Sequence, residues 1–380
     1  MKLREVRFDD HSAVAAVLAR NGLRTPTLEQ WKYFWTDVPD GDRLSGVPMG
    51  WVLEDEACGL VGTFRNVACL YEWNGRPITV AVASAWAVDP AHRRASLGLA
   101  AEYFRQRQAD VLLNTTAVEE TSGKAFLAFG AKRVPQPSYT ERLLWVTGYA
   151  GFASGLARQR RVPGALIAGA LAGGLMWAFD RMTGRNQAAV KPSDAVRLAG
   201  AFDERFDRFW DALRQQANRL RAVRDRRTLT WRFQLERRRP TIVVLEEGTG
   251  LGGYAVLVER HQPEIGVHRM EVADFQVLGD DSARVRTLMR GVLCLVGRQG
   301  IHLVAMSGQN EAKRQALGSL KPYRKRVPGW PLYYKAVDAA LQEPLQSPDA
   351  WDMSLYDGDM LWSGAFDAGS GPRDGGHAGS

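Results

Sequence analysis

The sequence predicts a mixed α/β protein with two related halves, each built on a mixed central sheet with helices on both faces. Three observations support this fold class. The chain has 380 residues, enough for two hydrophobic cores at roughly 100–200 residues per domain. Its first part has strand-like runs followed by a strand–helix–strand–helix succession, which is typical of mixed sheets. Its second part repeats this order at an offset of about 190 residues.

The first half shows each element of this pattern in turn. Asn74-Gly75 is a strong two-residue hairpin signal, and the run Ile78–Val88 after it is rich in Val, Ala and Trp, as a buried central strand should be. The other expected elements are a strand Leu3–Phe8, a helix Ser12–Asn21, hairpin-like runs at Trp51–Leu53 and Leu60–Leu70, a helix ending near Gln108, a strand Val111–Asn114, a helix Ser122–Phe129 and a last strand near Arg142–Val146.

Several sequence segments of the second half correspond to segments of the first. Leu251-Gly252-Gly253 corresponds to Leu60-Val61-Gly62, Met270–Val277 to the strand that ends at Val88, and Lys313–Gly318 to Ala125–Gly130. We therefore expect an N-terminal domain over 1–148, a linker over 149–197, a degenerate C-terminal domain over 198–342, a docking tail over 343–364 and a disordered tail over 365–380.

An apolar run lies between the halves. Val162–Phe179 is uncharged over 18 residues, which is the lower limit for a membrane span, and the basic sequence RQRR precedes it. Pro163 and four glycines weaken a lone helix, and a span would place the two halves on opposite sides of the bilayer. A buried or interfacial hydrophobic hairpin is favoured, with a peripheral membrane contact as one use; a true span stays open.

Composition narrows the class of protein. A net charge of +8 and a pI near 9.5 favour an anionic partner without selecting one. Three cysteines without metal-ligand spacing suggest neither a disulfide framework nor a metal site. The N-terminal sequence has no apolar leader, so we expect a cytoplasmic protein, with association to the inner membrane left open.

The turn VDPAHRRASLGLA, which begins at Val88, lies between a strand and an amphipathic helix. Backbone N–H groups at such a turn, together with the helix dipole, favour an anion. Arg93 and Arg94 supply charge, Ser96 can donate a hydrogen bond, and Gly98 permits close approach of a phosphate. A pyrophosphate is expected over residues 94–99.

This turn resembles the signature V-x-P-x-x-(Q/R)-x-x-G-x-(G/A) of the GNAT superfamily of acyl-CoA N-acyltransferases, with Ser96 in place of the first glycine. The resemblance implies that acetyl-CoA is the co-substrate, that the Val88 backbone pairs with its pantetheine arm, and that the amides after Arg93 hold its pyrophosphate. The implied coenzyme-binding residues are Val88, Arg93, Arg94, Ala95, Ser96, Leu97, Gly98, Leu99 and Asn114.

The sequences LTWRF…RRRP at Leu229–Pro240 and PLYYKA at Pro331–Ala336 look like those of acetyltransferases found with bacterial exopolysaccharide gene sets, and more distantly like Fem-type proteins. This implies transfer of an acetyl group to a small-molecule amine, such as an amino sugar or a polysaccharide precursor. Two alternatives stay open: a non-catalytic GNAT-fold protein that binds a partner or a membrane, and a Fem-type transferase that uses aminoacyl-tRNA.

Catalytic groups are harder to assign. Several family members carry a glutamate in the strand before the turn and a tyrosine four residues before the late glycine; here Thr79–Val88 has no glutamate and Phe126 occupies the tyrosine position. The candidate bases are therefore Glu119 and Glu120, and the thiolate would have to leave with help from water, from Tyr139 or from no group. Glu119 and Glu120 also suit an ordinary helix N-terminal turn.

In the second half, Glu271 and Asp274 should point to opposite faces of their strand. Asp274 is the better candidate for a central cleft, and an ion pair with an arginine is its alternative role.

Two further groups have alternative interpretations. The aromatic segment Trp31–Trp35 suits either an acceptor pocket or the core. The basic run Arg219–Arg239 suggests nucleic acid, but its arginines fall on several helix faces, so we expect a solvated helix and disfavour a nucleic-acid partner.

Overall fold

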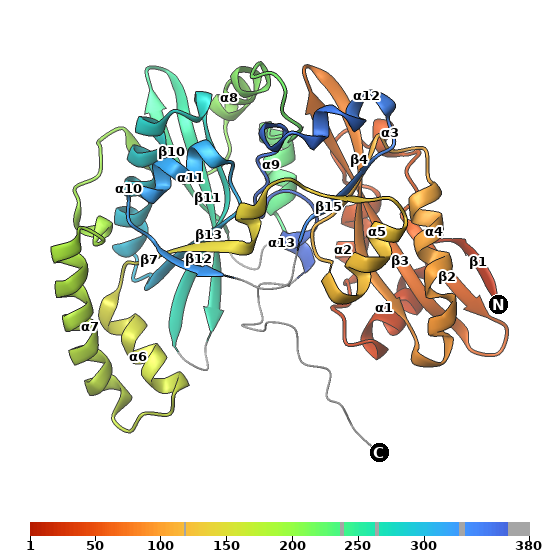
Figure 1. The fold of residues 1–380 in the computed structure, drawn as a ribbon, viewed down its shortest axis with the longest axis horizontal. Coiled ribbons are helices and arrows are strands. Elements are labelled where there is room, and N and C mark those ends of the chain that lie inside the picture. The colour runs from red at the N-terminus through yellow and green to blue at the C-terminus, as the bar shows by residue number, and fades with distance from the viewer. Residues whose placement is uncertain (118, 236–238, 263–265, 327–330, 364–380) are drawn as a thin grey trace.

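The computed structural model describes residues 1–117, 119–235, 239–262, 266–326 and 331–363. Two twisted sheets stand side by side, each with helices packed against it (Figure 1). The first sheet has the order β1 (Lys2–Glu5), β2 (Gly50–Asp55), β3 (Gly59–Trp73), β4 (Arg76–Val88), β5 (Val111–Asn114), β15 (Tyr333–Ala336) and β6 (Lys132–Arg133), and β9 (Arg221–Ala222) also pairs with β3. The second has the order β8 (Val196–Ala199), β10 (Thr241–Glu247), β11 (Gly250–Gln262), β12 (Val267–Val277), β13 (Leu303–Ser307), β7 (Glu141–Val146) and β14 (Tyr323–Arg326).

The two strand orders correspond position by position. In each sheet, antiparallel strands lead to a parallel pair, which is β4 with β5 in the first sheet and β12 with β13 in the second. The predicted fold class and the predicted repeat are both confirmed. The predicted hairpin is confirmed too: Asn74 and Gly75 have φ values of 51° and 78°, as a tight turn between β3 and β4 requires.

The two sheets exchange one strand each. β7 belongs to the first half by sequence but pairs with β13 and β14 in the second sheet. β15 belongs to the second half but pairs with β5 and β6 in the first. Assigning Arg142–Val146 to the sheet of the first half was therefore wrong, because a short strand carries little information about its partner. The predicted domain limits stay a prediction.

Helices cover both sheets. They are α1 (His11–Arg20), α2 (Leu28–Trp35), α3 (Gly41–Leu44), α4 (Ser96–Arg105), α5 (Lys124–Ala128), α6 (Tyr149–Gln159), α7 (Ala165–Thr183), α8 (Glu204–Arg214), α9 (Arg226–Phe233), α10 (Ser282–Gly297), α11 (Glu311–Gly318), α12 (Ala339–Gln342) and α13 (Met360–Ser363). α4 packs on the first sheet and α10 on the second. α6 and α7 form a hairpin at the outer edge of the second sheet (Figure 1).

The largest hydrophobic core lies between the two halves and includes the tail of the chain. Side chains of β3 and β4 pack there with side chains of α8, α9 and β11, and with Trp351, Met353 and Tyr356. The tail is buried from Ala350 to Leu361. The predicted disordered segment, residues 365–380, lies outside the described residues.

Arginines from the basic run hold this tail. Arg224 pairs with Asp357 of the tail and with Asp274 of β12, and all three side chains are buried. Arg232 donates hydrogen bonds to the carbonyl oxygens of Tyr356 and Gly358. The expectation of a solvated basic helix was therefore wrong for these arginines, because their charges are used inside the molecule.

No helix among the described residues has both the length and the sustained apolar character that crossing a bilayer requires. The apolar run Val162–Phe179 does not fold as the predicted hairpin: from Ala165 on it lies in the single helix α7, which packs against α6. Most large apolar side chains of α7 are exposed.

Candidate functional site

The central opening of the first sheet lies where β4 leaves β5. Their parallel pairing covers Val80–Val82, and the pocket begins at the next residue of β4, Ala83. Ser84 and Trp86 of β4 pair with consecutive residues of β3, so Ala85 between them is the extra residue of a β-bulge, and its φ is 49°. A bulge bends its strand and increases the twist, so β4 diverges from β5 here.

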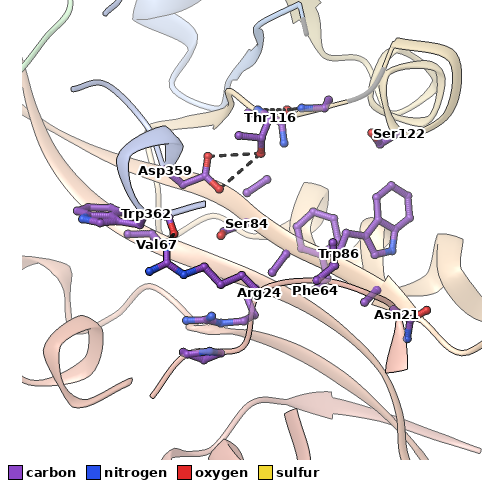
Figure 2. Close-up of a pocket in the computed structure, with 18 of the residues that line it drawn as sticks. Asn21, Arg24, Phe64, Val67, Ser84, Trp86, Thr116, Ser122, Asp359 and Trp362 are labelled. Carbon is purple, nitrogen blue, oxygen red and sulfur yellow. Dashed lines mark hydrogen bonds between the residues drawn. The ribbon is translucent and has the colours of Figure 1, made fainter. Parts of the chain in front are cut away.

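A pocket of about 1330 Å³ occupies this opening (Figure 2). Its walls come from the segment between α1 and α2, from β3 and β4, from the start of α4, from the segment after β5, from the second half and from the tail. Lining residues that carry the argument below are Arg65, Ser84, Val88, Arg93, Ser96, Leu97, Asn114, Arg260, Arg269, Asp359 and Trp362. The pocket thus extends from the N-terminus of α4 to residues of the second half.

Five of the residues implied to bind the coenzyme line this pocket: Val88, Arg93, Ser96 and Leu97 around the turn, and Asn114 at the end of β5. Arg94, Ala95, Gly98 and Leu99 are not among its lining residues. The side chains of Arg93 and Arg94 are exposed, as is Gly98. Leu99 is buried in the core under α4. The structure therefore brings the predicted turn to the pocket, but Leu99 contributes packing from the opposite side.

The turn itself differs from the predicted row of unpaired amides. Pro90–Ala95 forms a 3₁₀-helix, in which the His92 amide donates to the Asp89 carbonyl (2.8 Å), and the Ser96 amide donates to the Arg93 carbonyl. Amides from His92 to Ser96 are thus used within the helix. α4 begins without a side-chain cap on its N-terminus, since Ala95 is the N-cap residue. Its first turn and the two arginines remain available to an anion.

Asn114 lines the pocket at the end of β5. Its side-chain oxygen accepts hydrogen bonds from the amides of Thr116 (3.3 Å) and Ala117 (2.7 Å), which shapes the turn after the strand. Asn114 therefore positions the wall of the pocket.

The predicted catalytic residues lie in several places. Glu119 and Glu120 fall in η3 (Glu119–Gly123), and their side chains lie outside the described part of the structure. Tyr139 is buried, and its hydroxyl contacts the Ser354 carbonyl (3.3 Å) and the Met360 sulfur (2.6 Å). Burial raises the pKa of Tyr139 well above its ordinary value.

Asp274 is buried between the halves rather than on the pocket wall. It accepts hydrogen bonds from Arg224 (3.1 Å), from the Tyr254 hydroxyl (2.7 Å) and from Gln276 (3.1 Å). This matches the alternative role stated for it, an ion pair with an arginine.

The expectation that Glu271 and Asp274 point to opposite faces was wrong. The register of β11 with β12 slips by one residue at Ala273, so that Val272 and Phe275 both pack on the α10 side. The bulge therefore places Glu271 and Asp274 on the same face of the sheet. Glu271 lies 3.2 Å from Arg269, a pocket residue.

Two carboxylates that the sequence analysis missed line the pocket, Glu259 of β11 and Asp359, and Asp359 is the more deeply buried. It comes from the tail, and only 2% of its surface is exposed. Its carboxylate accepts hydrogen bonds from the hydroxyls of Thr115 (2.8 Å) and Thr116 (3.4 Å), and Figure 2 shows it pointing toward Thr116. Burial raises the pKa of Asp359, while hydrogen bonds from Thr115 and Ser84 act in the opposite direction.

Arg65 of β3 is the buried cation of the same pocket. It is 6% exposed, its guanidinium lies 5.0 Å from the ring centre of Trp31, and its Nε has no hydrogen-bond partner. Burial lowers the pKa of Arg65 to about 10, against the attraction of Asp359. Arg65 therefore stays charged at neutral pH and supplies positive potential to the pocket.

The aromatic segment divides between core and pocket. Trp31 and Tyr33 are buried, and Tyr33 stacks on Trp231 of α9 with ring centres 4.9 Å apart. Phe34 lines the pocket, where Trp362 of the tail packs against it at 4.8 Å. The described residues contain no group of three or more His, Cys, Asp or Glu side chains arranged to hold a metal ion.

No family model and no curated protein matches this sequence. Solved structures share its fold. A protein of unknown function from Enterococcus faecalis V583, described as a "Probable N-Acyltransferase", aligns with a TM-score of 0.53 at 10% identity over 89% of this chain and 73% of its own. A GCN5-related N-acetyltransferase from Anabaena variabilis ATCC 29413 aligns with a TM-score of 0.52 at 10% identity, covering 88% and 72% of the two chains.

N-myristoyltransferase from Saccharomyces cerevisiae, solved with bound myristoyl-CoA, gives a TM-score of 0.52 at 11% identity, with 88% of this chain and 78% of that chain covered. Identities this low establish a shared fold and nothing finer. The chain thus has the fold of known acyl-CoA N-acyltransferase structures.

Proposed function

We propose that this protein is an acyl-CoA-dependent N-acyltransferase that transfers an acetyl group to a small-molecule amine. The observation that carries the proposal is the pocket between the diverging β4 and β5, which joins the N-terminus of α4 to a buried carboxylate, Asp359. Acetyl-CoA would supply the acyl group as an activated thioester.

The residues at the α4 end fit the coenzyme. Arg93 lies on the pocket wall and Arg94 is exposed beside it, so both guanidinium groups can meet phosphate oxygens. The uncapped N-terminus of α4 adds the positive end of a helix dipole. A Cβ atom at Gly98 would meet only Leu3 at 3.6 Å, so the surface over this glycine is open.

Asp359 is suited to take the proton from the amine as its nitrogen bonds to the acyl carbon. Burial raises its pKa, and a higher pKa makes a carboxylate a stronger proton acceptor. The hydroxyls of Thr115 and Thr116 fix the position of this carboxylate in the pocket wall. The departing coenzyme thiolate would take its proton from water, since the Tyr139 hydroxyl is engaged by Ser354 and Met360.

The acceptor is expected at the other end of the pocket, where Arg260 and Arg269 of the second half line the wall. An amino sugar or another polysaccharide precursor is the acceptor we propose, on the family resemblance of the sequence. The positive potential of Arg65 favours an acceptor that also carries an anionic group.

Isothermal calorimetry with acetyl-CoA tests this function. The wild-type protein should bind acetyl-CoA, and an Arg93→Glu, Gly98→Glu double variant should bind it about 10- to 100-fold more weakly, because charged hydrogen bonds are lost and like charges meet. Arg298→Glu, an exposed charge reversal at the end of α10, is the matched control and should bind as the wild type does. Absence of binding at millimolar acetyl-CoA would remove the proposal.

A further inference from the structure

The outer face of α7 is an unusual protein surface. The large apolar side chains that point outward are Val162, Leu166, Ile167, Leu171, Leu175, Trp177, Phe179 and Met182, with exposed fractions from 39% to 86%. They make up half of the large apolar side chains that the described residues expose. The rest are spread over the molecule, as is normal for a protein in water. Contiguous exposed apolar surface of this kind marks an interaction site.

The inward face of α7 explains why these side chains cannot be buried by the protein itself. α7 turns its glycines toward α6: a Cβ atom at Gly169 would lie 2.3 Å from Ser154 Cα, and one at Gly173 would lie 2.8 Å from Ala150 Cα. The two helices therefore touch backbone to backbone, and the helix packs on its small residues while presenting its large ones. This reverses the arrangement of an ordinary surface helix, whose apolar stripe faces the core.

The charges of this segment are mostly basic. From residue 149 to residue 197 the sequence contains two acidic residues, Asp180 and Asp194, and seven basic ones, at 158, 160, 161, 181, 185, 191 and 197. Asp180 is buried, where it accepts hydrogen bonds from the hydroxyls of Tyr149 (2.9 Å) and Tyr323 (2.6 Å). Arg160 and Arg161 are exposed just before α7, and Arg181 is exposed near its end. The apolar face is thus flanked by cations at both ends.

We propose that the outer face of α7 docks the protein on the surface of an anionic lipid bilayer, with the helix lying in the plane of the interface. The apolar side chains enter the boundary between headgroups and acyl chains, and the flanking arginines meet lipid phosphates. Trp177, which is 49% exposed, suits the headgroup level, where tryptophan is enriched. The α7 helix is continuous over 19 residues, three of which are glycine, and it enters the interface without crossing the bilayer. This inference does not depend on the proposed acyltransferase activity.

Vesicle co-sedimentation of the full chain tests the proposal. The protein should pellet with vesicles of phosphatidylcholine containing phosphatidylglycerol, and much less with vesicles of phosphatidylcholine alone. Leu171→Ser with Leu175→Ser should weaken binding about 10- to 100-fold, because two exposed leucines lose their transfer into the apolar phase. Arg160→Gln with Arg161→Gln should weaken binding only to the anionic vesicles, about 10-fold.

Leu127→Ser with Leu198→Ser is the matched control, since both leucines are exposed elsewhere, at 43% and 47%, and should leave vesicle binding unchanged. Light scattering in solution measures the oligomeric state and so distinguishes a lipid bilayer from a second copy of the chain as the occupant of this face. A dimer that the Leu171→Ser, Leu175→Ser variant converts to a monomer would show that a second copy covers this face and would overturn the proposal. A wild-type protein that stays in the supernatant at millimolar anionic lipid would also overturn it. Acetyl-CoA binding, measured on the same samples, reports separately on the pocket.

Discussion

The two halves have equivalent sheets but use the equivalent opening differently. In the first half the gap beyond the β4–β5 pairing holds the pocket. In the second half the gap beyond the β12–β13 pairing is filled by Lys313 of α11, which is fully buried. Its ammonium donates to the Phe275 carbonyl (3.0 Å) and to the carboxylate of Asp352 (2.5 Å). One opening holds a pocket, and the other is filled by a buried ion pair.

The helices that follow these strands differ in the same sense. α4 begins without a side-chain cap, whereas the N-terminus of α10 is capped by Asp281, which accepts a hydrogen bond from the Arg284 amide (2.8 Å). Asp280, the residue before it, pairs with Arg219 at 2.7 Å. Acidic side chains thus lie at the start of α10, whereas two arginines, Arg93 and Arg94, lie just before the start of α4. A duplicated fold can therefore keep one half for ligands and give the other a structural role.

The tail serves both openings. Asp352 accepts a hydrogen bond from the Asn310 amide (2.9 Å) after β13, and Asp359 accepts one from the Thr115 hydroxyl (2.8 Å) after β5. The two aspartates take corresponding places in the two halves, but Asp352 faces an ammonium ion and Asp359 faces a cavity. This pair offers the sharpest way to test the comparison.

Asp359→Asn should have the largest effect on activity. The amide cannot accept the amine proton, so we expect kcat to fall about 100- to 10,000-fold in an assay of free coenzyme A release with an amino sugar as acceptor. The melting temperature should stay equal or rise, because a neutral amide avoids the cost of burying a carboxylate that is disfavoured in its charged form. An unchanged kcat would exclude Asp359 as the base.

Lys313→Met should show the reverse pattern. It leaves Asp352 buried without its ammonium partner, and breaking a buried ion pair costs about 3–5 kcal/mol of the free energy of unfolding. Denaturant unfolding measures this loss, and acetyl-CoA binding to the folded variant should be unchanged. Adding Asp352→Asn should recover part of the stability. If the single variant were as stable as the wild type, the buried ion pair in the second opening would not contribute to the stability of the protein.

The pH profile sharpens the role of Asp359. Only the charged carboxylate accepts a proton, so kcat/KM should fall as the pH drops through the raised pKa of Asp359, which places the acidic limb above the usual aspartate value near 3.9. The same raised pKa has the opposite consequence for stability, since folding favours the protonated form and stability falls as pH rises from the unfolded to the folded pKa. In Asp359→Asn both changes should disappear.

The helix N-termini give the smallest effects. Asp281→Ala removes the cap of α10 and should cost about 1 kcal/mol of stability with no change in acetyl-CoA binding. Ala95→Asp places a carboxylate at the start of α4, where the helical conformation of residue 95 does not favour a cap, so stability should change by less than about 0.5 kcal/mol while acetyl-CoA binding weakens, because the carboxylate competes with phosphate. Thermal unfolding and calorimetry together check both variants.

Local patterns predicted the parts of the structure that local physics decides. The Asn74-Gly75 turn and the repeated strand order follow from short-range rules on turn residues and periodicity. The exchange of β7 and β15 depends on long-range pairing, to which strands of six and four residues contribute few identifying contacts. The bulge at Ala273 reversed the predicted face of Glu271, because one extra residue breaks the alternation.

The candidate site shows the same limit. The turn at Arg93 could be predicted because its combination of residue types is unusual. Its 3₁₀ conformation over Pro90–Ala95 could not, since most of these residues suit an open turn as well as a 3₁₀-helix. Asp359 lies in the segment predicted to dock, but nothing in the local sequence marks it as a pocket residue, and only burial between the halves gives it a role. Arg224 was misjudged for the same reason, because its two carboxylate partners are 50 and 133 residues away.

The exchange of β7 and β15 between the two sheets interlocks the two halves of the chain. A fragment that ends in the linker would contain β7, which belongs to the second sheet, and would lack β15, which belongs to the first. Each of the two fragments would therefore have an unpaired sheet edge, and neither is complete without the other. A nick in the connecting segment should still yield a stable, non-covalent pair that separates only on denaturation. Duplication with strand trading in this way converts two modules into one inseparable folding unit.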